Sequence, residues 1–156
     1  MSDNKQHATI LVVDDVSDNV VILSLALQDM GYRVITAVDG EEATKVASAA
    51  RPDLILMDIA MPNLDGMAAT RQIRKHEDLQ NVPIVACTAF DTAGFRQAAY
   101  DAGFNGYLTK PIDFERLGNL ITMLLSKEEE RSVAAESQAP SRVLTTSVMT
   151  PVKKAS

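Results

Sequence analysis

Residues 9–15 read TILVVDD, a short apolar run that ends in two aspartates. Four similar runs follow along the chain, at 33–37 (RVITA), 54–57 (LILM), 84–87 (IVAC) and 106–108 (GYL). The first, third and fourth runs are hydrophobic without alternation, which is typical of parallel strands that are covered on both faces. These runs therefore predict a parallel β-sheet.

Longer stretches with helical character separate the apolar runs. In the clearest, residues 17–30, apolar side chains at positions 20, 23, 27 and 30 form one stripe, and Gly31 supplies a stop. The other predicted helices are 40–50, 67–76, 91–102 and 114–126. Strand and helix thus alternate five times, which predicts an α/β doubly wound fold, because right-handed crossovers place helices on both faces of the sheet.

The composition changes near the end of the chain. Residues 127–131 (KEEER) can extend the last helix by a turn, and beyond them Ser, Thr, Ala, Pro and Val occur without any period. Such a segment buries too little apolar surface to offset its ordering entropy. We therefore expect an N-terminal extension at 1–7, a folded domain at 8–126 and a flexible, disordered tail at 127–156.

Composition excludes several classes of protein. The chain has 156 residues, 46% of them hydrophobic, and a net charge of −6, which is −7 over residues 1–126 and +1 beyond them. A folded part this acidic disfavours binding to nucleic acid or to an anionic membrane. The only cysteine, Cys87, allows neither an internal disulfide nor a cysteine metal cage. The apolar run near the start is too short for a secretory signal or a membrane span. We expect a cytoplasmic protein.

Polar side chains follow the predicted strands. Asp14 and Asp15 end the first strand and Asp58 the third, while Thr88 follows the fourth and Lys110 the fifth. In an open parallel sheet, ligands bind at the carboxyl ends of the strands. Taken singly, each residue has an ordinary alternative role as a helix cap, a turn residue, a strand residue or a solvated charge. Together they predict one site.

The chemistry of that site favours a divalent cation. Three clustered carboxylates repel one another, and oxygen ligands without His or Cys favour Mg²⁺, which shares its shell readily with a phosphoryl group. Lys110 and Thr88 are suited to contact phosphoryl oxygens, and an aspartate is an established nucleophile in phosphoryl transfer. Spacing alone does not decide which aspartate attacks, although Asp58 is favoured because it stands singly.

The motifs resemble those of the receiver domain of two-component response regulators. The matching stretches are ILVVDD (10–15), DLILMDIAMPNLDG (53–66), CTA (87–89) and GYLTKP (106–111), in the family's order and spacing. The resemblance covers about residues 8–126 and implies a flavodoxin-like (βα)5 fold with strand order 2-1-3-4-5. It also implies a phosphorelay signalling protein of the stand-alone type, a phosphoprotein that forms an aspartylphosphate.

The resemblance implies roles for the residues of the site. Asp58 is the phosphoacceptor, Asp15 and Asp58 bind Mg²⁺ directly, Asp14 acts mainly through water, and the backbone carbonyl of Ala60 adds a metal ligand. The phosphoryl group would be held by Thr88 and Lys110, and the Lys110–Pro111 bond is expected to be cis.

The resemblance also implies how the signal is made and read. The phosphoryl group would come from a sensor histidine kinase or a histidine phosphotransfer protein. Thr88 and Tyr107 would form the switch, with Thr88 moving to the phosphoryl group and Tyr107 turning inward. A downstream protein target would read this change. The alternative for Tyr107 is an ordinary half-buried tyrosine on an edge strand.

Other residues give this chain individual features. Ala60 and Phe90 cannot orient an attacking water, so we expect slow self-dephosphorylation. Val21, Ile22 and Leu25 lie off the core stripe of the first helix, where they either dock a histidine-bearing partner or pack against the last helix.

Three rival functions remain at this stage. An aspartate-nucleophile phosphohydrolase needs an acid two residues after the nucleophile, where this chain has Ala60, so we expect no enzyme beyond self-phosphorylation and dephosphorylation. A flavin-binding electron carrier of the same topology would not place Asp14 and Asp15 in its phosphate loop. A degenerate scaffold would not need the complete set of site residues. The part after residue 126 is too short for a DNA-binding domain, so we expect no direct DNA binding.

Overall fold

A computed structural model describes residues 8–60, 65–89 and 91–143, with 131–143 described by their backbone alone. Five parallel strands form one sheet in the order β2-β1-β3-β4-β5. The strands are β1 (Thr9–Val13), β2 (Arg33–Ala37), β3 (Leu54–Asp58), β4 (Ile84–Thr88) and β5 (Gly106–Thr109). The predicted doubly wound fold and its strand order are confirmed.

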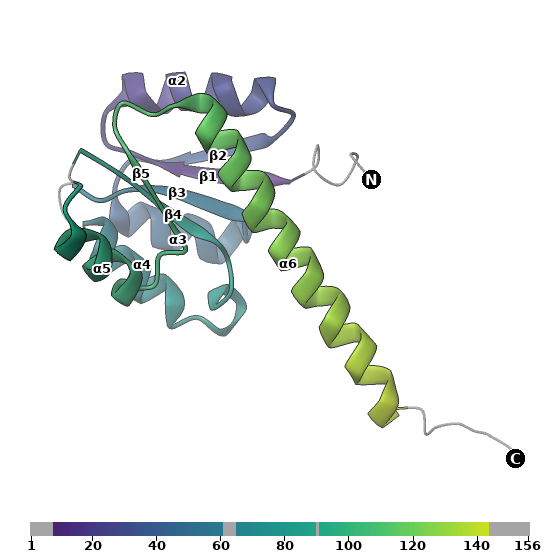
Figure 1. Ribbon diagram of the computed structural model, residues 1–156. Helices are drawn as coiled ribbons and strands as arrows, with labels where there is room; N and C mark the ends of the chain where they lie inside the picture. Colours follow the sequence, from purple (N-terminus) through teal and green to yellow (C-terminus); the bar gives the residue numbers. More distant parts are fainter. Residues whose placement is uncertain (1–7, 61–64, 90, 144–156) are drawn as a thin grey trace, which may run out of the picture. The chain divides into compact units, whose positions relative to one another are not determined.

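Helices cover both faces of the sheet (Figure 1). They are α2 (Ser17–Asp29), α3 (Gly40–Ala50), α4 (Gly66–Arg74), α5 (Ala93–Ala102) and α6 (Phe114–Val143), with a 3₁₀ turn, η1, at Glu77–Leu79. α3, α4 and α5 lie on one face, and α2 with the first turns of α6 lies on the other. No helix among the described residues combines the length and the apolar character needed to cross a bilayer.

Local signals in the sequence explain where three of the helices begin. Asp39 caps α3 by accepting a hydrogen bond from the Glu42 N–H at 2.8 Å, and Asp65 caps α4 in the same way. Thr92 caps α5. α5 ends at Gly103, whose φ of 117° suits glycine. Each cap fixes a helix that starts near the carboxyl ends of the strands, where the candidate site lies.

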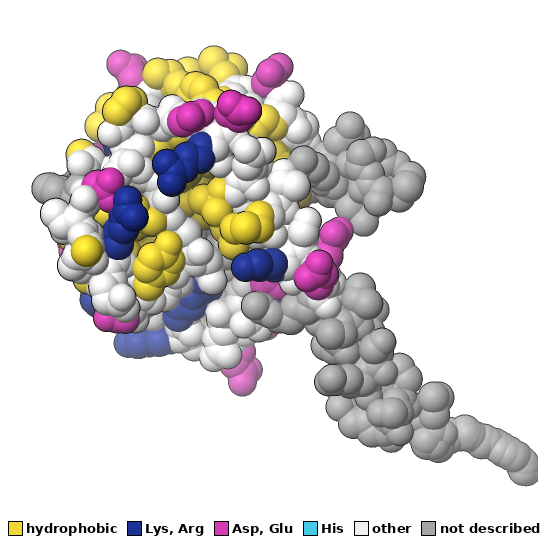
Figure 2. All heavy atoms as spheres, in the orientation of Figure 1, with side chains coloured by type: hydrophobic (Ala, Val, Ile, Leu, Met, Phe, Trp, Pro, Cys, Tyr) yellow, Lys and Arg dark blue, Asp and Glu magenta, His cyan; other side chains and the backbone are white. Residues whose placement is uncertain are grey.

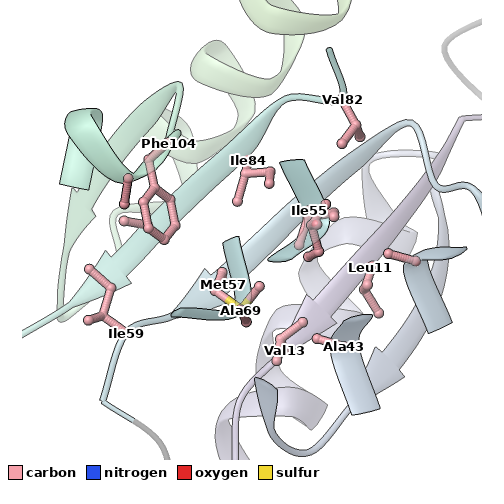
Figure 3. Close-up of a cluster of buried hydrophobic side chains, with 14 of the residues drawn as sticks. Leu11, Val13, Ala43, Ile55, Met57, Ile59, Ala69, Val82, Ile84 and Phe104 are labelled. Atoms are coloured by element: carbon pink, nitrogen blue, oxygen red, sulfur yellow. The ribbon is translucent and has the colours of Figure 1, made fainter. Parts of the chain in front are cut away.

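The core is formed by side chains that alternate along the central strands. Leu11, Val13, Ile55 and Met57 point to one face and pack with residues from the covering helices and from the start of β4, as Figure 3 shows. The intervening residues, Ile10, Val12, Leu54 and Leu56, are also buried. β3 and β4 are buried along their whole lengths, as expected for strands covered on both faces.

The last helix corrects one prediction. We expected a flexible tail after residue 126, with one added helical turn allowed at 127–131, whereas in the structure α6 continues to Val143. The strong helix formers Glu, Lys, Arg, Ala and Gln fill most of residues 127–139 and favour continuation of the helix, whereas Pro140 opposes it. Residues 144–156 lie outside the described residues. The chain divides into two compact units within α6, Met1–Thr122 and Met123–Ser156.

Candidate functional site

Three aspartates meet at the carboxyl edge of the sheet. Asp14 directly follows β1 and Asp58 is the last residue of β3, and the two side chains are buried while Asp15 is exposed. One carboxylate oxygen from each of Asp14, Asp15 and Asp58 lies within 4.8 Å of the others. The predicted clustering of these acids is therefore present in the structure.

Lys110 provides the positive charge of this cluster. Its Nζ lies 3.3 Å from Asp14 Oδ2 and 3.4 Å from Asp58 Oδ2, so one ammonium group is shared between two buried carboxylates. Lys110 directly follows β5, and the Lys110–Pro111 peptide bond is cis, as expected. Thr88 ends β4 and is buried, and its carbonyl accepts a hydrogen bond from the Lys110 N–H at 2.8 Å.

Burial and charge perturb the titration of this cluster. Burial raises the pKa of Asp58, Lys110 lowers it and Asp14 raises it, with a net increase. Burial lowers the pKa of Lys110, but the charges of Asp58 and Asp14 outweigh burial and raise it. The cluster therefore holds more negative charge than its one lysine neutralises, which is the situation a divalent cation relieves.

The donor set suits a hard cation. The cluster consists of carboxylate oxygens alone, and Ala60 lies beside it because its N–H donates to Asp58 Oδ1 at 3.3 Å. Such oxygen ligands fit Mg²⁺ or Ca²⁺ better than zinc or copper. These residues are therefore able to hold a divalent metal ion.

Sequence reasoning missed two residues that shape the site. Asn19, on the first turn of α2, donates from Nδ2 to Asp14 Oδ2 at 3.2 Å, and the Val16 N–H donates to Asp14 Oδ1 at 2.9 Å. A Cβ at Gly66 would lie 2.4 Å from the Asp58 carbonyl oxygen, so only glycine lets α4 begin this close to β3. Gly66 could have been found from the sequence, because it ends the motif at 53–66, whereas an asparagine in a predicted helix gives no such signal.

The expected switch residue, Tyr107, lies half-buried on β5, which is an edge strand. Its ring meets Phe95 edge to face, with centroids 6.5 Å apart, and Arg96 lies over it at 5.4 Å from the ring centre. Burial and the nearby Asp91 raise its pKa, so the hydroxyl stays protonated at neutral pH. Phe90, invoked above for slow dephosphorylation, lies outside the described residues.

Comparison with known proteins identifies the family. The family model of the response regulator receiver domain matches residues 10–122. The chain is 38% identical over 128 residues to the response regulator PleD of Caulobacter vibrioides, covering 80% of this chain and 28% of PleD. It is also 38% identical to the histidine-protein kinase BarA of Escherichia coli, covering 76% of this chain and 13% of BarA.

Solved structures agree with this assignment. The receiver domain of the sensor histidine kinase PA1611 from Pseudomonas aeruginosa has a TM-score of 0.73 and 38% identity, covers 77% of this chain and 98% of its own, and has a magnesium ion coordinated in its active-site cleft. The chemotaxis protein CheY4 of Vibrio cholerae has a TM-score of 0.73 and 33% identity, with 76% and 98% covered.

This chain belongs to the response regulator receiver domain family of two-component systems. It spans less than a third of the length of PleD and less again of BarA, so the family assignment concerns the domain that these proteins share.

Proposed function

We propose that the protein accepts a phosphoryl group on Asp58 from a phosphohistidine of a sensor kinase or of a phosphotransfer protein. The observation that carries this proposal is that Lys110 contacts both Asp14 and Asp58 within a cluster of three carboxylates. In the transfer, a carboxylate oxygen of Asp58 forms the new bond to phosphorus. The phosphorus–nitrogen bond of the donor breaks, and its electron pair stays on the imidazole.

We propose that Mg²⁺ is the cation, held directly by Asp15, Asp58 and the Ala60 carbonyl, and by Asp14 mainly through water. When bound, the ion supplies charge neutralisation for the acids and for the incoming phosphoryl oxygens. Asn19 fixes the orientation of Asp14 through the hydrogen bond to Oδ2. The magnesium ion in the related PA1611 domain supports this choice of metal.

Lys110 and Thr88 complete the site after the transfer. Once a cation neutralises the acids, the Lys110 ammonium is free to exchange Asp14 for a phosphoryl oxygen. Thr88 is the last residue of the adjacent strand β4, and we propose that its hydroxyl donates a second hydrogen bond to the phosphoryl group. Because the phosphoryl group ends on a residue of the chain itself, we propose that the protein is a signalling protein and not an enzyme.

A docking surface for the histidine-bearing partner is available on α2. Val21, Ile22 and Leu25 are exposed by 54, 52 and 62%, which does not agree with their being packed under the last helix. Figure 2 shows hydrophobic side chains gathered over α2. Because α2 follows directly after Asp14 and Asp15, an apolar helical face docked on it would bring a histidine near the acids.

Incubation with acetyl phosphate and Mg²⁺, followed by intact mass spectrometry, tests the proposal. Wild type should gain one phosphoryl group, and chelation of the metal should abolish the gain. Asp58→Asn should gain none, whereas the matched control Asp29→Asn, at an exposed position on the end of α2, should behave as wild type. Gain of a phosphoryl group by Asp58→Asn would refute Asp58 as the acceptor.

A further inference from the structure

Two residues of α5 hold the aromatic ring of Tyr107. Phe95 meets the ring edge to face, with centroids 6.5 Å apart and an interplanar angle of 81°, and the guanidinium carbon of Arg96 lies 5.4 Å from the ring centre. Both distances fall within the ranges at which aromatic pairs and cation–π pairs attract. The position of the ring on β5 is therefore coupled to the first turns of α5.

Arg96 is itself fixed by a second contact. Its guanidinium forms an ion pair with Asp91, and its Nε donates to Asp91 Oδ1 at 2.6 Å. Asp91 immediately precedes Thr92, which caps α5 through the Phe95 N–H. Both contacts go to the same oxygen, Asp91 Oδ1, and both side chains are about half-exposed, so the ion pair favours modestly the arginine conformation that covers Tyr107.

The register of β4 and β5 places Tyr107 beside a small residue, on the face that also carries Thr88. Tyr107 lies opposite Ala86, and Thr88 lies two residues further along β4, on the same face as Ala86. Ala86 carries only a methyl group, so the register places no large side chain between the ring and Thr88 on this face. A ring that turned in this direction would separate from Arg96, because Arg96 stands on α5 and is half-exposed.

We propose that Arg96 is a positioning residue that holds the Tyr107 ring against α5 and thereby opposes the conformational change coupled to phosphorylation of Asp58. This inference rests on the proposed function and adds a regulatory contact to it. Because the contact is made only while the ring lies against α5, Arg96 stabilises that state alone and shifts the equilibrium toward it.

Arg96→Met is the test variant, since methionine keeps the packing of the side chain and removes its charge. We expect it to react with acetyl phosphate about 2- to 5-fold faster than wild type, the factor that corresponds to a partly exposed cation–π contact. Loss of a positive charge by itself should slow the reaction with an anionic donor. The proposed role of Arg96 and the simple effect of charge therefore predict opposite changes in the reaction rate.

A second readout follows the ring directly. The chain has three tyrosines and no tryptophan, so ring-labelled tyrosine gives an NMR spectrum in which Tyr107 is assigned by a Tyr107→Phe variant. Without any donor, Arg96→Met should move the Tyr107 signal part of the way toward its position in phosphorylated wild type. Asp91→Asn should move it in the same direction by less, and Arg71→Met, on the exposed side of α4, should leave it unchanged.

The outcomes separate the two proposals. If wild type is phosphorylated normally and Arg96→Met matches it in rate and in the Tyr107 signal, the proposed role of Arg96 is overturned. The proposed function is then left intact. Wild type that gains no phosphoryl group would overturn both. Faster reaction of Arg96→Met without movement of the Tyr107 signal would also overturn the proposed role of Arg96.

Discussion

The two edges of the sheet treat their charged side chains in opposite ways. At the amino edge, the Arg74 guanidinium donates hydrogen bonds to the carbonyls of Leu79, Val82 and Gly103 and to Asn105 Oδ1, at 2.6–3.1 Å. At the carboxyl edge, three carboxylates cluster around one ammonium group, which contacts two of them, Asp14 and Asp58, at 3.3 and 3.4 Å. One edge is electrostatically satisfied, and the other has excess negative charge.

The difference follows from what each edge does. The amino edge joins segments that are far apart in sequence, and Asn105 extends the network because its Oδ1 also accepts from the Ile84 N–H at 2.9 Å. Complete hydrogen bonding there gains stability. The carboxyl edge gives up part of this stability, because acids that were already neutralised by protein groups would bind neither a cation nor a phosphoryl group.

The largest effect is expected at the satisfied edge. Arg74→Met removes a charged donor from three carbonyls and from Asn105, and we expect it to lower the free energy of unfolding by about 3 kcal/mol. Urea denaturation measures this change. Phosphorylation of the remaining folded protein by acetyl phosphate should be unaffected, because Arg74 lies at the edge opposite the acids.

Arg71→Met serves as the control for this variant. Arg71 lies on the same helix and its side chain is exposed, so its replacement should change the free energy of unfolding by less than about 0.5 kcal/mol. Equal losses in the two variants would show that the hydrogen bonds of Arg74 add nothing to stability, and the contrast between the edges would then be wrong.

A smaller effect of opposite sign is expected at the acidic edge. Asp58→Asn, measured with the divalent cations chelated, should raise the free energy of unfolding at neutral pH by about 1–2 kcal/mol, because it removes one buried carboxylate from the cluster. The amide oxygen is still able to accept the hydrogen bond from the Ala60 N–H. Stabilisation of the variant that cannot be phosphorylated would show directly that the site is built at the expense of stability.

The pH dependence of this effect has a definite sign. Burial and Asp14 raise the pKa of Asp58 above its ordinary value of 3.8, despite Lys110, so the folded protein takes up a proton at a higher pH than the unfolded chain. The contribution of Asp58 to stability is therefore greatest at low pH and is lost as the pH rises through the folded-state pKa. The advantage of Asp58→Asn over wild type should grow from about pH 4 to about pH 7. An advantage that shrinks over this range would contradict the raised pKa.

Much of the fold and of the site could be predicted from local sequence signals. Continuous apolar runs gave the parallel strands, and the polar residues that follow them gave the acids, Thr88 and Lys110, because the ends of parallel strands meet at one edge. Two structural refinements were small, since β3 includes Asp58 and β4 includes Thr88. The strand order required the resemblance to a family, because hydrophobic periodicity carries no information about which strands are neighbours.

The remaining features depend on contacts between distant residues or on summed propensities. Arg74 and Asn105 are 31 positions apart, and neither shows a local pattern that indicates their hydrogen bond. The Arg96 contact with Tyr107 likewise depends on how α5 lies against β5. The extension of α6 was missed for another reason, since the lack of period and the small buried apolar surface indicated disorder, whereas residues 127–139 are mostly strong helix formers.

The smallest effect is expected at Cys87, which lies beside Asp58 in the register of β3 and β4 and takes no part in the chemistry. Burial, the largest cause, together with Asp58 and Asp14, raises the pKa of the thiol to about 12, despite Lys110. The thiolate is the reactive form and the thiol is buried, so at neutral pH the folded protein should react with iodoacetamide more slowly than the unfolded chain. Cys87→Ala should lower the free energy of unfolding by only about 0.5–1 kcal/mol and leave phosphorylation unchanged. Rapid alkylation of the folded protein, or loss of phosphorylation in Cys87→Ala, would mean that the carboxyl edge opens to solvent beyond its acids, and the boundary drawn here between site and core would have to move inward.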